Sequence, residues 1–323
     1  MPFTVVRFNL ADPRGTPESL SERYRAALAM AAYADTHGID TVQTEEHHGV
    51  ADNWLPSPFA FAGAVFGATR RIAVTVSAAI GPLHDPLRLA EEIAVLDLLS
   101  AGRLVTVAGI GYRPEEYAER GIDWSRRGEL QDLLLETLLR AWSGEPFTYR
   151  GRTVRVTPRP LTRPHPPLLV GGSSRAAARR AARLGLPFFP SAHLPELAAY
   201  YRQRCAEYGT DGWTLMPAEE TPLLHVSRDP DRCWALYGEH LLHEARTYAS
   251  WQSKDIRSAV RSRATTTEEL RAEGVYRIVT PDECVALGPR SPVLHPLCGG
   301  MPVEEAWRSL RLFGEEVLPR LGA

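Results

Sequence analysis

The chain has 323 residues, of which 44% are hydrophobic and 24% are charged. This balance, with a formal net charge of -2 and a mean hydropathy of -0.22, excludes a disordered or collagen-like chain. The small net charge gives no electrostatic basis for a nucleic-acid partner. Lys254 is the one lysine among 37 basic residues, so chemistry that needs a placed lysine, such as a Schiff base or a Walker phosphate loop, is excluded.

The cysteines point to a reducing compartment. Cys205, Cys233, Cys284 and Cys298 have neither the CxxC spacing of a zinc site nor the density of a disulfide framework, so we expect no metal site. The first residues show no basic segment followed by an apolar one, and no apolar run reaches membrane-spanning length. We therefore expect a cytoplasmic protein with no membrane partner.

Short β-branched runs alternate with longer amphipathic runs along the chain. Strands are predicted at residues 3–8, 40–43, 71–77, 103–107, 168–170, 186–189, 223–226 and 292–295. Helices are predicted at residues 18–36, 57–69, 86–99, 125–142, 173–184, 195–208 and 303–318. Because parallel strands need crossover connections, this order predicts an α/β fold, a (β/α)8 TIM barrel with loop insertions. An open doubly wound sheet is the alternative.

Two segments interrupt the alternation. Residues 147–167 (FTYRGRTVRVTPRPLTRPHPP) are rich in proline and arginine and contain a small hairpin around Arg150-Gly151. Because a strand follows at once, we interpret this segment as an insertion rather than a domain linker, and residues 228–275 as a second, helical insertion. Before the last strand, residues 286–292 (ALGPRSP) replace a full crossover helix. We expect one domain over residues 1–323.

The second predicted strand ends in the most reactive segment of the chain, Glu45-Glu46-His47-His48-Gly49. Catalytic residues of a barrel lie at the carboxyl ends of its strands. A solvated loop is the plain alternative, and a metal site lacks the HxH or HExxH pattern. Neighbouring residues of an extended segment point to opposite sides, so one histidine faces the barrel mouth and the other does not.

Small residues end the third and fourth strands. Ala78 and Ala79 lie in SAAIGPLHDP, and Gly109 and Ile110 lie in AGIGYR. Residues without bulky side chains let a flat ligand approach the backbone. Tight packing within the barrel, followed by a turn, is the alternative explanation for these small residues.

The fifth strand runs through Gly171-Gly172-Ser173-Ser174 into an alanine-rich helix. Free N–H groups at a helix start, together with two hydroxyls, suit a phosphate group. An ordinary serine N-cap is the alternative. The segment is not GxGxxG, so a Rossmann dinucleotide site is discounted.

Together these segments resemble the bacterial luciferase-like family of flavin-dependent monooxygenases. The resemblance is most specific in TVQTEEHHG, in SAAIGPLHDPLRLAEEIAVLDLLSAGRL and in GIGYRPEEYAERGID, and PLLVGGSSRAAARRAARLGLP supports it. It implies a barrel that binds reduced flavin at its carboxyl-terminal mouth, and a homodimer.

The resemblance also implies roles for single residues. His47 matches the catalytic histidine, with Glu46 beside it. Ala78-Ala79 matches the place where the family often has a non-proline cis peptide bond under the flavin ring. The flavin phosphate is expected on Gly172, Ser173 and Ser174, and the other cofactor residues are expected to be Ala78, Ala79, Gly109, Ile110 and Gly171. Two departures, Ile110 in place of an arginine and Gly171-Gly172 in place of an acidic residue, speak against light emission.

The implied activity is oxygenation of a small organic substrate. Reduced FMN from a separate flavin reductase would react with O2 to give a peroxyflavin, and His47 would serve as a general base or hydrogen-bond partner. Hydride transfer with the deazaflavin coenzyme (F-420) is the alternative. A non-catalytic flavin-binding protein and a metal-dependent hydrolase represent other classes. Substrate contacts are expected in residues 51–54, 191–193 and 228–273, but the aromatic set Trp234, His240, His243, Tyr248 and Trp251 is interpreted as core.

Overall fold

The computed structural model describes residues 2–252, 256–287 and 292–321. Lys254 and most of the segment 286–292 lie outside these residues. Contacts divide the chain into two compact units. Unit 1 consists of Met1–Pro56, Ala68–Ile72 and Pro217–Ala323, and unit 2 consists of Ser57–Gly67 and Ala73–Met216.

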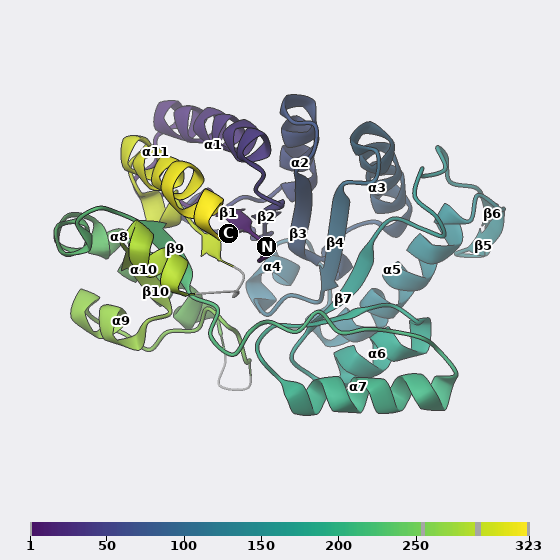
Figure 1. Ribbon diagram of the computed structural model, residues 1–323. Coiled ribbons are helices and arrows are strands. Elements are labelled where there is room, and N and C mark those ends of the chain that lie inside the picture. The colour runs from purple at the N-terminus through teal and green to yellow at the C-terminus, as the bar shows by residue number, and fades with distance from the viewer. Residues whose placement is uncertain (1, 253–255, 288–291, 322–323) are drawn as a thin grey trace. The chain divides into compact units, whose positions relative to one another are not determined.

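Unit 1 contains five parallel strands in the order β10-β9-β11-β1-β2. The strands are β1 (Val5–Phe8), β2 (Thr41–Thr44), β9 (Leu223–Val226), β10 (Tyr276–Val279) and β11 (Val293–Leu294). The helices are α1 (Pro17–His37), α8 (Pro230–Trp251), α9 (Thr267–Glu273), α10 (Pro281–Ala286) and α11 (Val303–Leu312). Figure 1 shows α1 and α11 side by side, and the two helices are in contact.

Local sequence explains where these helices begin and end. Thr16 caps α1 in a reciprocal capping box with Ser19, and Gly38 ends the helix in the left-handed conformation. Thr280 and Glu283 form a second capping box at α10. Helix α8 packs on the sheet through a hydrophobic core that includes Val5, Leu223, Val293, Leu241, Leu242 and Ala245.

Unit 2 contains four parallel strands in the order β3-β4-β7-β8. The strands are β3 (Ala73–Ile80), β4 (Leu104–Gly109), β7 (Leu168–Gly172) and β8 (Phe188–Pro190), and β5 (Phe147–Tyr149) pairs with β6 (Arg152–Val154) in a separate antiparallel hairpin. The helices are α2 (Pro58–Ala68), α3 (Pro86–Ser100), α4 (Pro114–Ala118), α5 (Arg127–Trp142), α6 (Arg175–Leu184) and α7 (Pro195–Tyr208).

Buried aromatic side chains tie the helices of unit 2 together. The indole of Trp142 on α5 donates a hydrogen bond to the carbonyl of Ala90 on α3, at 3.0 Å. The hydroxyl of Tyr201 on α7 donates to the carbonyl of Leu186, at 2.8 Å, and its ring stacks on Phe188 of β8. Helix α6 packs against α7, and the two lie side by side in Figure 1.

The strands observed include every strand that the sequence predicts, with ends that differ by a few residues, and the hairpin around Arg150-Gly151 is confirmed. Two predictions were wrong. Residues 276–279 form an additional strand, β10, followed by the short helix α10, so the connection before β11 is not a bare loop. Residues 256–266 are not helical, which divides the predicted helical insertion into α8 and α9.

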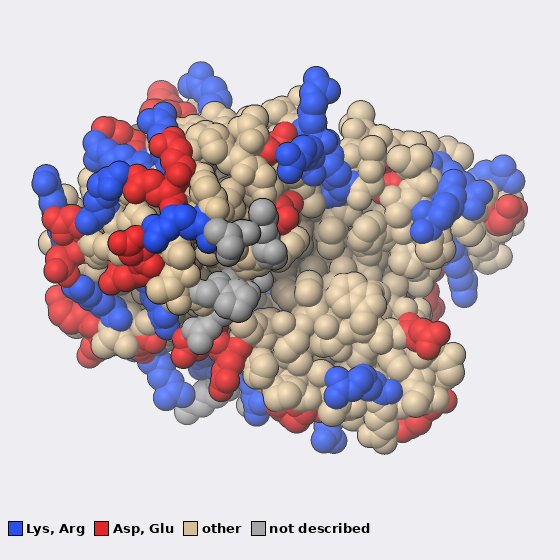
Figure 2. All heavy atoms as spheres, viewed as in Figure 1, with Lys and Arg blue, Asp and Glu red and all other residues tan. Residues whose placement is uncertain are grey.

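Charged side chains of both signs are interspersed over helices α8 to α11 (Figure 2). Ion pairs at the surface join residues on these helices or next to them: Arg228 with Glu316, Arg271 with Asp231, Arg308 with Glu304, and Arg320 with Asp282. In the described part of the chain, no helix combines the length and the apolar character needed to cross a bilayer.

Candidate active site

Arg7, Glu45 and Tyr248 form a buried charged group at the strand ends of unit 1. Arg7 lies on β1, Glu45 follows β2, and Tyr248 comes from α8. The Nη2 atom of Arg7 donates to both carboxylate oxygens of Glu45, at 2.9 and 2.7 Å, and the Tyr248 hydroxyl donates to Oε2, at 2.5 Å. Burial alone would lower the pKa of Arg7, but the nearby Glu45 carboxylate holds it well above its ordinary value. Both carboxylate oxygens of Glu45 are thus occupied by Arg7, and one of them also by Tyr248.

In the segment after β2, successive side chains have different surroundings, as they do in an extended chain. Glu45 contacts Arg7 and Tyr248, whereas Glu46 accepts from His48, with 2.7 Å between Oε1 and Nε2. The His47 ring instead lies against aromatic side chains. His47 and His48 therefore have different surroundings, as the alternation predicts. The acidic neighbour Glu46 forms its ion pair with His48, two residues further along the chain.

His47 is 6% exposed and is surrounded by aromatic rings. The ring centroids of Trp54, Tyr248 and Trp251 lie 5.3, 6.1 and 4.7 Å from that of His47. The backbone holds this arrangement, because the His47 N–H donates to the carbonyl of Leu55. An imidazole in such surroundings can exchange a proton where water has little access.

Glu244 on α8 is the centre of a second buried group. Its carboxylate accepts from the side chain of Asn9, at 2.9 Å, and from the backbone N–H of Gly299, at 3.1 Å. The Nε2 atom of His295 lies 2.9 Å from Oε1, and the Cys298 thiol lies 3.3 Å from Oε2. Burial would raise the pKa of Glu244, but the interaction with His295 holds it well below its ordinary value. This network fixes α8 on the ends of β1 and β11.

In unit 2 the predicted cofactor residues lie at the carboxyl ends of strands β3, β4 and β7 or directly after them. Ala79 pairs in register with Ala108 of β4, and Ala108 pairs with Val170 of β7. A Cβ atom added to Gly109 would lie 3.1 Å from the Cβ of Ala78. The strand ends of β3, β4 and β7 therefore consist of small residues that pack closely on one another. The non-proline cis peptide bond lies at Ser77-Ala78, one residue before the Ala78-Ala79 pair to which the resemblance assigns it.

The turn from β7 into α6 requires glycine. Gly172 has a φ of +146°, and an added Cβ would lie 2.9 Å from that of Ala177. The hydroxyl of Ser174 accepts from the N–H of Ala177, at 3.2 Å, as an ordinary N-cap does. Ser173 is half-buried beside it, and the first N–H groups of a ten-residue helix follow. These donors fit the phosphate group of a flavin nucleotide.

Ile110 has a backbone role at the end of β4. Its carbonyl accepts from the Tyr117 hydroxyl, at 2.5 Å, which anchors the chain to α4. Unit 2 holds the predicted cofactor residues, on neighbouring strands or directly after β7: Ala78, Ala79, Gly109, Gly171, Gly172, Ser173 and Ser174. Glu46 and His47 belong to unit 1.

The sequence interpretation missed the contribution of α8. Glu244, Tyr248 and Trp251 follow the spacing of one helix face, and the aromatic members of this face are predicted to pack in the core. Tyr248 and Trp251 do pack in a hydrophobic core, with Trp54, but their rings also lie against that of His47. Glu244 of the same face holds the ends of two strands. The sequence signal that could have revealed this role is a glutamate on the same helix face as the aromatic residues. An apolar core rarely holds an unpaired carboxylate, so such a face indicates polar partners.

Comparison with known proteins identifies the fold and the family. Monooxygenase RslO1 from Streptomyces bottropensis has 27% sequence identity and a TM-score of 0.77, with 99% of each chain covered. This confirms the predicted fold class, α/β of the TIM-barrel kind. Two further structures share the fold alone. The oxygenating constituent of 3,6-diketocamphane monooxygenase from Pseudomonas putida, in complex with FMN, has a TM-score of 0.72 at 18% identity. An F-420-dependent secondary alcohol dehydrogenase has a TM-score of 0.69 at 17% identity.

Curated relatives match over part of their length. The oxygenase component of the flavin-dependent trigonelline monooxygenase of Acinetobacter baylyi is 26% identical over 161 residues, which cover 47% of this chain and 44% of the relative. An uncharacterized protein of Sinorhizobium fredii is 29% identical over 190 residues, 57% of this chain and 54% of the relative. The chain thus spans about half the length of these relatives. A family model described as luciferase-like monooxygenase matches residues 1–286, and the chain belongs to that family.

Proposed function

We propose that the protein is a monooxygenase that uses reduced FMN and O2 to oxygenate a small organic substrate. The observation that carries the proposal is His47, which lies among three aromatic rings while the neighbouring carboxylate of Glu45 is bound to Arg7. Its imidazole is thus a titratable group enclosed by aromatic rings at the end of a strand, where a barrel places its catalytic residues. The named activities of relatives, a flavin-dependent monooxygenase among them, support the reaction class.

The cofactor is assigned to unit 2. Ala78, Ala79 and Gly109 would lie against the flavin ring, because none has a side chain that would obstruct it. Ser173 and the N-terminus of α6 would hold the phosphate group, to which Gly172 allows close approach. When bound, reduced FMN supplies the electron pair with which one oxygen atom of O2 goes to the substrate and the other to water.

Proton handling is assigned to unit 1. His47 accepts or donates a proton at its imidazole, as a general base or acid. Trp54 and Trp251 limit the access of water to that ring. Tyr248 is held by Glu45 and Arg7 and fixes the position of the His47 ring from α8.

A separate flavin reductase is the partner that this proposal requires, and the similarity to the oxygenase component of a flavin-dependent monooxygenase supports it. A homodimer and a cytoplasmic location are further expectations from the family resemblance. The alternative cofactor is the deazaflavin coenzyme (F-420), which an enzyme of the same fold uses. It would make the protein a hydride-transfer oxidoreductase.

Binding of reduced cofactors under anaerobic conditions tests the proposal. We expect reduced FMN to bind and reduced deazaflavin to bind at least tenfold more weakly. Admission of O2 to the FMN complex should then consume O2 in the presence of substrate. Tight binding of deazaflavin with no binding of FMN would reverse the choice of cofactor, and absence of binding for both would contradict the assignment of unit 2.

A further inference from the structure

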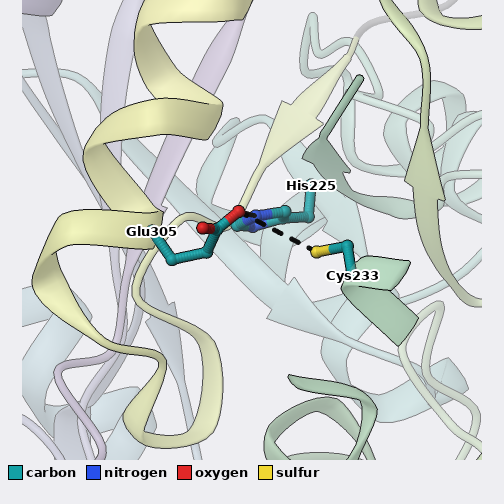
Figure 3. A group of neighbouring side chains, drawn as sticks. All are labelled: His225, Cys233 and Glu305. Atoms are coloured by element: carbon teal, nitrogen blue, oxygen red, sulfur yellow. Dashed lines mark hydrogen bonds and ion pairs between the residues drawn. The ribbon is translucent and has the colours of Figure 1, made fainter. Parts of the chain in front are cut away.

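A second group of reactive side chains lies inside unit 1, apart from His47. His225 comes from β9, Cys233 from the first turn of α8, and Glu305 from the first turn of α11. Figure 3 shows the three side chains converging from these three elements. They are 2%, 3% and 8% exposed. The mechanism proposed above uses none of them.

Hydrogen bonds do not account for the His225 ring. Neither Nδ1 nor Nε2 has a hydrogen-bond partner in the described residues, although both are buried. The Oε1 atom of Glu305 lies 3.6 Å from Nε2, which is too far for a hydrogen bond. A neutral imidazole has one donor and one acceptor, and buried groups of both kinds are nearly always paired. Both ring nitrogens are therefore without a hydrogen bond in the described residues, and Glu305 is a charged neighbour of Nε2.

The three ligand atoms surround a space of the size that a metal ion needs. The thiol sulfur of Cys233 lies 4.0 Å from Oε1 of Glu305, and one ligand atom from each residue lies within 4.8 Å of the others. In a tetrahedral zinc site with bonds of about 2.0–2.3 Å, ligand atoms lie about 3.3–3.6 Å apart. Contraction of about 1.3 Å or less would bring the present arrangement to that geometry.

The surroundings of Glu305 and His225 already orient them. The second carboxylate oxygen, Oε2, accepts from Arg308, at 3.0 Å, which leaves Oε1 directed at His225 and Cys233. Strand β9 is paired on both sides, with β10 and β11, and the N–H of Val226 donates to the hydroxyl of Ser309 on α11. Outer contacts of this kind hold metal ligands in position.

A similar set of residues serves as a contrast. Glu244, His295 and Cys298 also place three ligand atoms within 4.8 Å. There, however, both nitrogens of the His295 ring have partners, Glu244 and the carbonyl of Arg7, and Asn9 also donates to the carboxylate. Nothing in that set is left for an ion to satisfy.

We propose that His225, Cys233 and Glu305 bind a zinc ion that joins β9, α8 and α11. A mixed set of nitrogen, sulfur and oxygen donors suits zinc, whereas calcium and magnesium require oxygen ligands. Three protein ligands leave a fourth position for water. The ion acts as a structural connection at the start of α8, the helix that carries Glu244, Tyr248 and Trp251 to the candidate active site.

Titration of the metal-free full-length protein with Zn²⁺ tests this site. We expect one zinc ion to bind per chain and to raise the melting temperature. The substitutions Cys233→Ser and His225→Gln should each weaken binding by at least about 100-fold, since loss of outer contacts alone costs 10–100-fold. Cys284→Ser, at another buried cysteine of unit 1, and Cys298→Ser, in the contrasting set, should bind zinc as the unchanged protein does.

Cobalt provides a readout that needs no variant. Co²⁺ bound to the unchanged protein should show a thiolate charge-transfer absorption, because Cys233 is a ligand. Absence of that absorption, or absence of stoichiometric zinc in the folded protein, would contradict the proposal. The proposal would also be contradicted if Cys233→Ser and His225→Gln both kept the zinc affinity of the unchanged protein. Loss of zinc binding in Cys298→Ser alone would contradict it as well.

Discussion

The strand ends of the two units differ in the side chains that they present. In unit 1, Arg7, Glu45 and Glu244 are buried charges, each with close partners. In unit 2, the corresponding ends carry Ala78, Gly109 and other small residues. There the methyl group of Ala78 lies close to the backbone of Gly109. The strand ends of unit 1 thus hold paired charges, and those of unit 2 hold small, uncharged residues.

The proposed function has two requirements, which the two units would meet by different physical means. Proton transfer needs a histidine whose ring is fixed, and fixing it in a buried place requires charges that are paired and hydrogen-bonded. A flat cofactor with a phosphate needs backbone donors and an absence of side chains. The contrast predicts that substitutions in unit 1 change turnover or stability, and that substitutions in unit 2 change cofactor affinity.

The largest expected effect is the loss of stability in Glu244→Ala. Removal of this carboxylate takes away the buried partner of Asn9 and of His295, which costs about 3–5 kcal/mol of the free energy of unfolding. Urea unfolding at neutral pH measures it. Glu239→Ala, at an exposed position of the same helix, is the control and should change stability by less than about 0.5 kcal/mol. Equal stability of the two variants would contradict the role given to Glu244.

His47→Ala should lower product yield per reduced flavin by about 100-fold or more, the usual scale for a general acid or base. The fold and most of the flavin affinity should remain, because the ion pair of Glu45 with Arg7 and the bonds of Glu244 hold the strand ends without the His47 ring. Product yield and melting temperature are measured on the same samples.

His48→Ala is the matched control for this prediction. It removes the ion pair with Glu46 and should mainly lower stability. A folded but inactive His48→Ala beside a fully active His47→Ala would reverse the assignment of the two histidines.

Replacement of both Ser173 and Ser174 by Ala should weaken flavin binding by about tenfold or more, because a hydrogen bond to a charged group contributes about 1.5–3 kcal/mol. The variant also loses the N-cap of α6. Thr266→Ala removes a similar N-cap from α9 in unit 1 and controls for that loss of stability, since it should leave flavin affinity unchanged. Unchanged affinity of the serine variant would place the phosphate elsewhere.

The smallest expected effect concerns acid stability. The pKa of Glu244 is lower in the folded chain than in the unfolded one, so its contribution to stability is present above the unfolded pKa of about 4.3 and is lost as the pH falls toward the folded value. The unfolding free energy of the unchanged protein should therefore fall more steeply below about pH 4 than that of Glu244→Gln. Parallel curves for the two proteins, measured by urea unfolding between pH 7 and pH 3, would exclude this linkage.

Much of the fold follows from local patterns. The apolar strands and the amphipathic helices repeat with periods that the sequence displays, and helix α7 has the ends that the pattern predicts. Strand β10 was missed because Tyr276–Val279 is short and follows a segment with helical character. Its tyrosine is buried beside Glu244, a contact that residues 32 positions apart make only in the folded chain.

For the candidate site, too, local patterns do not reveal contacts between residues that are distant in the sequence. The sequence marks the segment Glu45–His48 as a candidate because catalytic residues of a barrel follow its strands, and strand alternation predicted different surroundings for its two histidines. The partners that determine these surroundings are distant in sequence, since Arg7 and Tyr248 are 241 positions apart. The pairing of Glu46 with His48 could not be derived from adjacency alone, because adjacency favours His47.

The most direct test of the separation between the two units is a double-variant cycle on flavin affinity. Reduced FMN is titrated under anaerobic conditions into the unchanged protein, His47→Ala, the Ser173→Ala/Ser174→Ala variant and the combination of all three substitutions. Independent sites usually add within about 0.3–0.5 kcal/mol, so removal of the serines should weaken binding by the same factor, within about twofold, whether or not His47 is present. If the serine effect disappears or grows by tenfold in the His47→Ala protein, cofactor binding and proton handling are not separate functions of the two units.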